Sequence, residues 1–585
     1  MAIGRTFQEA LLKGMRSMEL SSIPKYSDLH KALEIPGPFR LWAIFDAFRD
    51  GMSLSEIHQL THIDPWFLHQ IGNLVAKEKM IGNQENLLAL KQSGFSDLQI
   101  AAFSNQTEAE IRLKRKEWGI APVYKRVDSC AAEFATSVAY LYSSYEEECE
   151  SHPTDRPKMI ILGSGPSRIG QGIEFDYGCV HAIQALKMEG YETIMINCNP
   201  ETISTDYNCA DKLYCSPMTA EDVLGIIDKE LPDAVLVQYG GQTPLNLTQS
   251  LASAGVPLLG VTTGLIETTE DRACFKQFLE LLKLKQPANA MIHSMEEGLK
   301  AAKHMGYPLI VRPSFVLGGR AMSIVLQESE LEQSLLEAFS ASVDKPVLLE
   351  KFLMDAIEVD IDAISDGKEV YIPGILEHVE PAGVHSGDSA CSLPPFSLSD
   401  AIQSELRAQT KKIALVLGLT GLLNIQFAIQ GNEIYVLEVN PRASRTVPFT
   451  SKATGIDLIK IATRCLLGIS LKTQGFLEGP DLKYFAVKEA VLPFSKFGID
   501  PMLGPEMKST GEVMGLGNTF VEAYAKAQIA SGYPLTKPGK GIVPGWGNTP
   551  AAKSLRKALQ IQQHYGVNSL NELHSVQEVL CPNIY

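Results

Sequence analysis

Apolar residues recur with helical spacing through roughly the first 150 residues. In the stretch HIDPWFLHQIGNLVAKEKMI, Asp64 can cap a helix that begins at Pro65. The apolar residues expected to share one face of this helix are Phe67, Leu68, Ile71, Leu74 and Val75. The pattern predicts a helical domain over residues 1–150.

A similar pattern occurs twice within this region, in residues 51–68 and 94–111. Both copies place Ser at the third position, Ile at the seventh and a helix-capping residue at the fourteenth. Two stacked helical hairpins are the simple interpretation. A DNA-binding helix-turn-helix is the alternative, since RLKRK at 112–116 adds local positive charge. The acidic chain favours a packing or subunit-contact module.

From Lys158 onward, short buried runs alternate with helical stretches. The runs KMIIL, YETIMIN, DAVLV and VPLLG are typical of strands, and HAIQALKMEG and AEDVLGIIDKEL of helices. This alternation predicts a parallel α/β sheet. Residues 290–475 mix strands and helices in an α+β pattern, including a hairpin whose turn is Gln430-Gly431-Asn432. After Gly532 the sequence is rich in Gly and Pro, with a loose helical pattern in AAKSLRKALQIQQHY.

Composition narrows the possible function. The 585 residues are 45% hydrophobic and 21% charged, as in globular proteins of several domains. The net charge of −16 argues against broad nucleic-acid or membrane-surface binding. There is no secretory signal or membrane-spanning run, and the ten cysteines form no CxxC pair. These features predict a cytoplasmic protein with reduced thiols.

Two glycine-rich loops are candidate binding sites. In GSGPSRIG at 163–170, the third glycine comes later than in the dinucleotide-binding fingerprint GxGxxG. The following strand ends in Asn197 rather than in an acidic residue. A strand-end loop facing a substrate is therefore preferred over an NAD site. In SFVLGGRAMSIV, Gly318-Gly319-Arg320 joins two apolar runs. This turn suits either phosphate binding or an ordinary hairpin, and it is not a Walker P-loop.

The sharpest constellation lies in EIYVLEVNPRASRTVPF. Glu438 and Asn440 are two residues apart on a strand and share one face, and the hairpin partner carries Gln426. Their oxygens suit Mg²⁺. Arg442 and Arg445 follow, where they can hold phosphoryl or carboxylate groups. An exposed edge face is the alternative, but the set favours metal-assisted phosphoryl transfer from a nucleotide.

Two further segments support this interpretation. Glu358 and Asp360 in AIEVDIDAI share a strand face in the same way. The polar segment HVEPAGVHSGDSACSLPP carries residues able to converge on a bound nucleotide, namely Gly383, His385, Ser386 and Asp388. No Ser-His-Asp triad or zinc spacing is legible in the sequence.

Long motifs in this chain resemble the large chain of carbamoyl-phosphate synthetase. They are ILGSGPSRIGQGIEFDYGCVHA, NCNPETISTDY, VQYGGQTPLNL, LKQPANA, VLGGRAM, EHVEPAGVHSGDSACSLP and EVNPRASRTVPFTSKATG. The match covers roughly residues 1–531. In that family, two homologous synthetase halves each pair a Rossmann-like pre-ATP-grasp domain with an ATP-grasp domain. The first half phosphorylates bicarbonate, ammonia then gives carbamate, and the second half phosphorylates carbamate.

The resemblance implies a division of this chain into five parts. They are a helical oligomerisation domain at 1–150, a Rossmann-like pre-ATP-grasp domain at 151–270, an ATP-grasp domain at 271–475, a closing segment at 476–531 and a truncated or divergent regulatory remnant at 532–585. It also implies carbamoyl phosphate synthesis for arginine and pyrimidine biosynthesis. The implied partners are a glutaminase small chain and a separately encoded N-terminal synthetase half.

The resemblance further implies which residues form the site. ATP would be surrounded by Arg312, Lys351, Leu353, Glu358, Gly383, Val384, His385, Ser386, Gln426 and Glu438. Two Mg²⁺ or Mn²⁺ ions would be held by Gln426, Glu438 and Asn440. Arg272 and Arg442, with Arg445 beside them, would orient the phosphates and carbamate. Catalysis would then be positioning and charge neutralisation.

Departures from the family leave alternatives open. Only one GSGP and one EVNPR block exist, so a first half is missing from this sequence. A different ATP-grasp ligase that joins a carboxylate to an amine, and a relic that only binds partners, are the rival interpretations. The segment MAIGRTFQEALLK at 1–13 matches MGLGNTFVEAYAK at 514–526 in seven of thirteen positions. We expect residues 1–13 to be the closing segment of an otherwise missing half.

Overall fold

The computed structural model describes most of the chain. The described residues are 1–20, 26, 28–128, 130–131, 133–134, 138–313, 317–342, 345–493 and 502–532. The helical pattern predicted at 551–565 and the expected regulatory remnant beyond residue 532 lie outside them. The described residues divide into two compact units: those within 1–166, 186–236 and 243–257 form the first, and the other described residues form the second.

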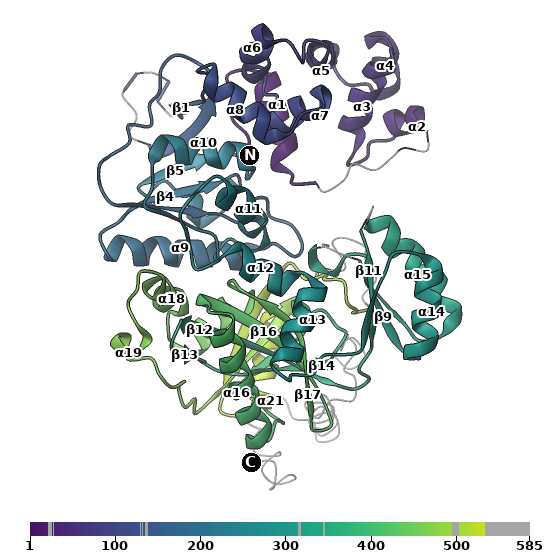
Figure 1. Cartoon of the computed structure of the whole chain (residues 1–585), viewed down its shortest axis with the longest axis vertical. Coiled ribbons are helices and arrows are strands. Elements are labelled where there is room, and N and C mark those ends of the chain that lie inside the picture. Colours follow the sequence, from purple (N-terminus) through teal and green to yellow (C-terminus); the bar gives the residue numbers. More distant parts are fainter. Residues whose placement is uncertain are drawn as a thin grey trace. The chain divides into compact units, whose positions relative to one another are not determined.

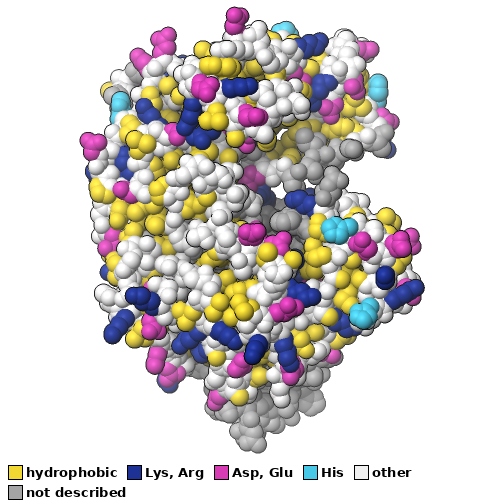
Figure 2. Space-filling view, in the orientation of Figure 1, with side chains coloured by type: hydrophobic (Ala, Val, Ile, Leu, Met, Phe, Trp, Pro, Cys, Tyr) yellow, Lys and Arg dark blue, Asp and Glu magenta, His cyan; other side chains and the backbone are white. Residues whose placement is uncertain are grey.

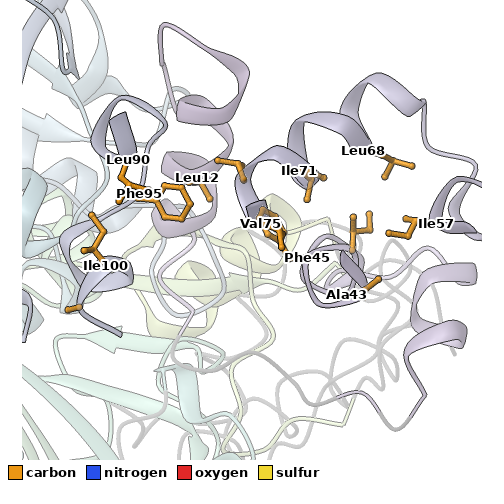
Figure 3. Packing of buried hydrophobic residues seen from close by; sticks show 14 of the residues in the cluster. Leu12, Ala43, Phe45, Ile57, Leu68, Ile71, Val75, Leu90, Phe95 and Ile100 are labelled. Carbon is orange, nitrogen blue, oxygen red and sulfur yellow. The ribbon is translucent and has the colours of Figure 1, made fainter. Parts of the chain in front are cut away.

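The N-terminal part of the first unit is helical, but the prediction of a helical domain over residues 1–150 is wrong beyond Glu117, because two strands lie within residues 123–144 (Figure 1). Its elements are α1 (Phe7–Ser17), α2 (Leu29–Glu34), α3 (Arg40–Arg49), α4 (Leu54–Thr61), α5 (Pro65–Glu78), η1 (Gln84–Asn86), α6 (Leu87–Gln92), α7 (Asp97–Ser104) and α8 (Glu108–Glu117). Their apolar faces meet in one core, to which α1, α3, α4, α5, α6 and α7 all contribute (Figure 3).

The two predicted helical hairpins are confirmed, with the predicted capping residues at 64 and 107. Ser53 and Ser96 each form a capping box at the start of α4 and α7. Asp64 and Thr107 cap the following helices α5 and α8. Phe67 is in angular register with Ile71 and Leu74, but it lies in the first turn of α5 and is 44% exposed, with its ring against Phe7 and Trp66.

The basic stretch 112–116 is neutralised within the first unit. Arg112 and Lys116 both pair with Asp228, and Arg115 forms a buried fork with Asp97. Basic and acidic side chains are also interspersed over the face drawn in Figure 2. These intramolecular partners favour the packing interpretation of the hairpins over a DNA-binding one.

The first unit also contains a mixed α/β sheet. Its strands are β1 (Val123–Arg126), β2 (Tyr140–Ser144), β3 (Lys158–Leu162), β4 (Glu192–Asn197), β5 (Lys212–Cys215) and β6 (Ala234–Leu236), paired in the order β1-β2-β5-β4-β3-β6. All pairs are parallel except β1–β2, so the predicted parallel sheet has an antiparallel edge. Within the first unit, η2 (Ile203–Thr205) and α10 (Ala220–Glu230) connect strands, and nearly all of α11 (Gln242–Ser253) belongs to this unit. Residues 173–185 of α9 (Ile173–Met188) belong to the second unit.

In the second unit, short β7 (Leu258–Leu259), α12 (Thr263–Glu270) and α13 (Arg272–Leu281) lead into a four-stranded antiparallel sheet of order β10-β9-β11-β8. Its strands are β8 (Asn289–Ile292), β9 (Leu309–Pro313), β10 (Ser323–Val325) and β11 (Val347–Lys351), and η3 (Leu317–Gly319) precedes β10. Helices α14 (Met295–Met305) and α15 (Glu328–Ala341) pack on one face of it (Figure 1).

The larger sheet of the second unit is antiparallel throughout, with the order β17-β16-β12-β14-β15-β18-β19 and β13 beside β12. Its strands are β12 (Ile357–Asp366), β13 (Val370–Tyr371), β14 (Leu376–Pro381), β15 (Cys391–Leu393), β16 (Thr420–Gln430), β17 (Glu433–Asn440), β18 (Phe485–Val491) and β19 (Gly511–Gly517). Its helices are α16 (Asp400–Val416), α17 (Thr446–Thr454), α18 (Leu458–Leu466), α19 (Leu471–Gln474) and α21 (Phe520–Ala530).

The β16–β17 hairpin has the predicted position but a tighter turn. Gln430 already pairs with Glu433 in the ladder, so only Gly431 and Asn432 form the loop. Gly431 has a φ of +64°, which a glycine adopts without strain. The helical region, the mixed α/β sheet and the two antiparallel sheets with their helices together confirm the predicted α/β and α+β multidomain fold.

The similarity between residues 1–13 and 514–526 is structural as well as sequential. Thr6 and Thr519 cap α1 and α21 by accepting hydrogen bonds from Glu9 N and Glu522 N. Lys13 bonds to the Ile3 carbonyl and to Glu9, and Lys526 bonds to the Leu516 carbonyl and to Glu522. The two segments therefore have the same cap and the same lysine tether.

Within the described residues, no helix is both long enough and apolar enough to cross a membrane.

Candidate active site

The predicted oxygen ligands meet on the β16–β17 hairpin of the second unit. Gln426 lies opposite Glu438, and Asn424 lies opposite Asn440, in the antiparallel ladder. Asn440 Nδ2 donates to Glu438 Oε1 at 2.9 Å. Gln426 Nε2 donates to Ser386 Oγ at 3.1 Å, which leaves its carbonyl oxygen available. The alternation of a strand thus gathers one carboxylate and two amides on one face.

Arg442 follows this hairpin and is anchored by its own loop. Its Nη2 donates to Asn440 Oδ1 at 3.2 Å and its Nη1 to the Ala443 carbonyl at 3.0 Å, while its guanidinium lies 5.7 Å from the Phe175 ring centroid. Burial and the neighbouring Arg445 lower the pKa of Arg442 to about 10. A desolvated cation pair of this kind favours a bound anion.

Arg445 is the second arginine of the loop. Its Nη2 donates to the Gly170 carbonyl at 2.8 Å. The Nε atoms of both Arg442 and Arg445 are buried without a hydrogen-bond partner among the described residues. Because a buried donor without a partner costs free energy, these two nitrogens fit an anionic ligand.

Arg272 and Arg312 add positive charge to the same region. Arg272 is the first residue of α13, and Arg312 lies on β9, where its Nε is 3.0 Å from Glu350 Oε2. Burial and Arg312 lower the pKa of Arg272, while Glu350 and Glu438 oppose this. These charges act on one another, so the structure brings Arg272, Arg312 and Glu438 together.

Glu358 is buried on β12, with Asp360 and Asp362 on the same strand face. Burial raises the pKa of Glu358 to about 7, with Asp360 and Glu438 adding to the effect and His378 and Arg312 opposing it. Asp360 is itself paired with His378 at 2.9 Å. Asp360 is therefore engaged by His378, while Glu358 remains under the influence of Arg312 and Glu438.

The polar segment after β14 forms a loop against the hairpin. Gly383 has a φ of +102°, and a Cβ there would lie 2.5 Å from Phe352 Cε2, so this position requires glycine. The Val384 N–H bonds to the Pro381 carbonyl, and the His385 N–H bonds to the Gly504 carbonyl at 2.8 Å. Burial and nearby cations, Arg445 first, lower the pKa of His385 well below its usual value.

Lys351 and Leu353 are held by backbone and apolar contacts. Lys351 Nζ donates to the carbonyls of Gly306 and Tyr307 at 3.1 and 2.8 Å, so its charge is used to tie β11 to the preceding turn. Leu353 packs against a small apolar group formed by Ala356, Ala382 and Ala428. Leu353 thereby lines an apolar surface, while Lys351 is engaged with backbone.

The two glycine-rich loops differ in character. The Gly165 N–H donates to Asn197 Oδ1 at 3.2 Å, so the first loop closes onto the asparagine at the end of β4. At the second loop, the Met507 N–H bonds to the Gly318 carbonyl, and a Cβ on Gly319 would lie 2.1 Å from the Pro505 carbonyl oxygen. Gly319 is therefore needed for backbone packing.

Several buried polar residues of this region were not singled out from the sequence. Asp362 accepts hydrogen bonds from Asn424, Ser444 and Thr446. Other residues of this kind are Gln238, Glu350, His378 and Lys488. Asp362 could have been predicted from the sequence, because it continues the alternating acidic positions that Glu358 and Asp360 begin along β12. The others lie far apart in sequence, and only the fold brings them near the site.

The arrangement can hold a polyanion with a metal. The Glu438 carboxylate and the amide oxygens of Gln426 and Asn440 are hard ligands, but they supply only part of a shell, which phosphate oxygens would complete. Four arginines, namely Arg272, Arg312, Arg442 and Arg445, contribute positive charge to the site. The nine cysteines among the described residues are free thiols, so no disulfide constrains this part of the chain.

Comparison with known families gives matches along three parts of the chain. The family described as "Carbamoyl-phosphate synthetase large chain, oligomerisation domain" matches residues 1–119. "Carbamoyl phosphate synthase preATP-grasp domain" matches residues 155–268, and "Carbamoyl-phosphate synthase L chain, ATP binding domain" matches residues 271–474.

Individual relatives agree. The carbamoyl phosphate synthase large chain of Pseudomonas syringae pv. tomato is 54% identical over 562 residues, covering 93% of this chain and 52% of that protein. The large chain of Neisseria meningitidis serogroup B is 54% identical over 554 residues, covering 92% and 52%. The chain thus spans about half the length of these relatives.

A solved structure shows the same fold. The biotin carboxylase–β,γ-ATP complex from Campylobacter jejuni is 17% identical and superimposes with a TM-score of 0.51, covering 72% of this chain and 98% of that one. At this identity, the similarity bears on the fold, and it supports an ATP-grasp arrangement of the two antiparallel sheets.

Proposed function

Because the chain belongs to the carbamoyl-phosphate synthetase large-chain family, we propose that its ATP-binding section phosphorylates carbamate. The products would be carbamoyl phosphate and ADP. The observation that carries this proposal is the joint placement of Gln426, Glu438, Asn440 and Arg442 at one end of the β16–β17 hairpin. Together they provide oxygens for a metal beside a buried cation for the transferred phosphoryl group.

In this proposal, the nucleotide lies between the two antiparallel sheets of the second unit. Glu358 accepts the ribose hydroxyls, and the Leu353 backbone contacts the base. Arg312 binds phosphate, and the loop of Gly383, Val384, His385 and Ser386 covers the nucleotide. Glu358 is suited to the ribose because its raised pKa of about 7 reflects a buried carboxyl for which new hydrogen-bond donors are favourable. Lys351 enters this set only if its side chain leaves the carbonyls of Gly306 and Tyr307.

Mg²⁺ or Mn²⁺ would be held by Glu438 with the amide oxygens of Gln426 and Asn440, and it would neutralise charge on the ATP phosphates. Arg442 and Arg445 bind the anionic oxygens through their orphan Nε–H groups. Arg272 stands at the start of α13, where Asp271 caps the Ala273 and Cys274 N–H groups, so its guanidinium is the group that would bind the ligand.

The chemical step needs no covalent bond to the chain. A carbamate oxygen forms a bond to the γ-phosphorus as the bond from that phosphorus to the β,γ-bridging oxygen breaks, and ADP carries away the electron pair. The chain holds the two anions in line and offsets their repulsion with arginine. His385, whose pKa is lowered, remains neutral and can serve as a hydrogen-bonding group.

Carbamate would have to be supplied by other components. We propose that a bicarbonate-activating synthetase half, outside these 585 residues, and a glutaminase small chain together provide it. The oligomerisation-domain match at residues 1–119 supports assembly of this chain with further chains. The product would then serve arginine and pyrimidine biosynthesis.

The reverse reaction tests the proposal without those partners. The purified chain is incubated with Mg·ADP and carbamoyl phosphate, and ATP is measured with a luciferase-coupled assay. We expect ATP to form, and Glu438→Gln to reduce its rate by about 100-fold or more. Glu433→Gln is the matched control, because Glu433 lies on the same strand but is exposed and pairs with Lys285.

The outcomes separate the candidates. ATP formation that depends on Glu438 but not on Glu433 supports carbamate phosphorylation. No ATP from carbamoyl phosphate, combined with Mg·ATP binding that Glu438→Gln weakens, indicates an ATP-grasp ligase with another carboxylate substrate. No ATP and no nucleotide binding would contradict an enzymatic role for this site.

A further inference from the structure

Gln238 is a fully buried glutamine that lies two residues after β6 and belongs to the second unit. Its amide has every hydrogen-bonding group in use. Nε2 donates to the carbonyls of Gly260 and Thr420 at 3.0 and 3.1 Å, and Oε1 accepts from the Leu422 N–H at 3.2 Å. The side chain therefore joins the start of β16 to the turn that contains Gly260.

The surroundings of this amide leave no room for displacement. A Cβ on Gly421 would lie 2.1 Å from Gln238 Oε1, and a Cβ on Gly260 would lie 2.9 Å from its Nε2. Both glycines also have positive φ values, +100° and +81°. The backbone thus adopts conformations suited to glycine on two sides of one side-chain amide, which fixes the position of that amide.

The main chain of Gln238 reaches the catalytic loop. Its carbonyl accepts a hydrogen bond from the Ala443 N–H at 2.9 Å. Ala443 follows Arg442 directly, and its own carbonyl accepts the 3.0 Å bond from Arg442 Nη1. One residue is therefore bonded both to the strand that carries Gln426 and to the loop that carries Arg442.

We propose that Gln238 is a positioning residue that sets the register between the β16 metal ligand Gln426 and the phosphoryl-binding Arg442. Its side chain fixes the first residues of β16, and its carbonyl fixes the peptide beside Arg442. The chemical consequence of this role rests on the proposed function, since it presumes that Gln426 and Arg442 act on the same phosphoryl group. The geometric consequence, a rigid 440–446 segment, does not.

Gln238→Met tests the role because methionine keeps the length and volume of glutamine but removes all three side-chain hydrogen bonds. We expect kcat for ATP formation from carbamoyl phosphate to fall by about tenfold or more, since small misplacements of reacting groups are costly. The KM for ADP should stay within about threefold, because Gln238 touches none of the residues proposed to hold the base or ribose. Amide exchange across residues 440–446 should become faster.

Gln474→Met is the matched control. Gln474 also donates to two backbone carbonyls, those of Ile461 and Ile469, but within the α18–α19 hairpin. If Gln474→Met lowers kcat as much as Gln238→Met does, or if Gln238→Met leaves kcat and the exchange of 440–446 unchanged, the positioning role is overturned. A rise in KM for ADP with unchanged kcat also overturns it.

Gln238→Glu provides a second test, which still decides the question if Gln238→Met folds poorly. An ionised carboxyl would face the Gly260 and Thr420 carbonyls with no proton to share, whereas the neutral carboxyl can accept from Leu422 and donate to one carbonyl. Activity relative to the parent and protection of 440–446 should both recover as pH falls from about 8 to about 6. A pH-independent variant contradicts the proposal.

The two levels of inference fail separately. If the parent chain forms no ATP, the proposed function is contradicted, and the exchange of 440–446 in Gln238→Met and Gln474→Met alone decides the positioning role. If the parent forms ATP, and Gln238→Met has the same kcat and the same amide exchange at 440–446 as the parent, the proposed function stands. The positioning role of Gln238 is then contradicted.

Discussion

Gln426 and Glu438 face each other across the antiparallel β16–β17 pair, immediately before a register shift that separates Gln426 from Phe427 in the ladder. The shift is a bulge, and a bulge reorients the side chains beside it. It lies where the proposed metal ligands meet, so the irregularity of the ladder is part of the site. The relationship between these two residues is the one on which the proposed metal site depends most directly.

Gln426→Met should weaken the binding of Mg²⁺ while leaving the chain folded. The substitution keeps the side-chain volume but replaces the amide oxygen with a thioether, which is a poor ligand for Mg²⁺. We expect the Mg²⁺ concentration for half-maximal ATP formation to rise by about tenfold. The measurement is a Mg²⁺ titration at fixed ADP and carbamoyl phosphate. Gln430→Met is the control, because Gln430 lies on the same strand and its side chain is exposed. Equal shifts in both variants would remove Gln426 from the metal site.

Arg442→Lys should lower the rate of ATP formation by about 100-fold although the positive charge remains. Lysine lacks the planar fork that bonds Asn440 Oδ1, the Ala443 carbonyl and, through the orphan Nε–H, an anion. Initial rates at saturating Mg·ADP are the measurement. Arg464→Lys, in the last turn of α18, should leave the rate within about twofold. A parental rate in Arg442→Lys would show that charge alone suffices there.

Lys91→Met should strongly destabilise the first unit. Lys91 is buried between Asp97, at 2.9 Å, and Glu221, and its removal would leave Asp97 with Arg115 and take from Glu221 its ion-pair partner Lys91. Breaking such a buried pair costs about 3 kcal/mol or more. Urea unfolding followed by tryptophan fluorescence reports on this unit, since Trp42, Trp66 and Trp118 lie in its helical part.

Lys116→Met is the matched control for that experiment. Lys116 pairs with Asp228 at 2.8 Å, but both side chains are more than 40% exposed. The substitution should therefore lower the free energy of unfolding by at most about 0.5 kcal/mol. Similar losses in the two variants would mean that the cluster around Lys91 is solvated in solution.

The local pattern of the sequence predicted the elements that depend on near neighbours. The caps at Asp64 and Thr107 were predicted correctly because a cap and its helix lie within four residues. The pairing of Glu438 with Gln426 followed from a hairpin with a short turn. The 44% exposure of Phe67 could not be predicted from the pattern, because exposure depends on which other elements pack against the first turn of α5.

The parts that escaped prediction depend on contacts distant in sequence. Gln238 bonds to Thr420, 182 residues away, and nothing in VQYGGQTPL indicates that partner. Lys351 is basic and close to predicted site residues, yet its ammonium bonds to two carbonyls about 45 residues earlier in the chain. The family resemblance supplied candidate residues, while the fold determined which of them share a charged environment.

Glu489 gives the second unit a pH-dependent stability. It lies on β18, where it accepts a 2.7 Å hydrogen bond from Gln528 Nε2. Burial, reinforced by Glu380, raises the pKa of Glu489 to about 8 from its ordinary 4.5. The folded chain thus holds a proton that the unfolded chain releases. The contribution of the protonated Glu489 to the stability of the folded chain is fully present below about pH 4.5 and is lost as pH rises through about 8.

Glu489→Gln should therefore stabilise the chain more at alkaline pH than at acid pH. Glutamine retains an oxygen for Gln528 and never ionises, so it avoids the cost of a buried charge beside Glu380. We expect the Tm difference between variant and parent to grow by a few degrees from about pH 5 to about pH 8.5. Thermal unfolding followed by circular dichroism measures it, with the exposed Glu478→Gln as the control that should show no such growth. A Tm difference that stays constant with pH, or one that shrinks, would show that Glu489 is ionised in the folded chain at neutral pH.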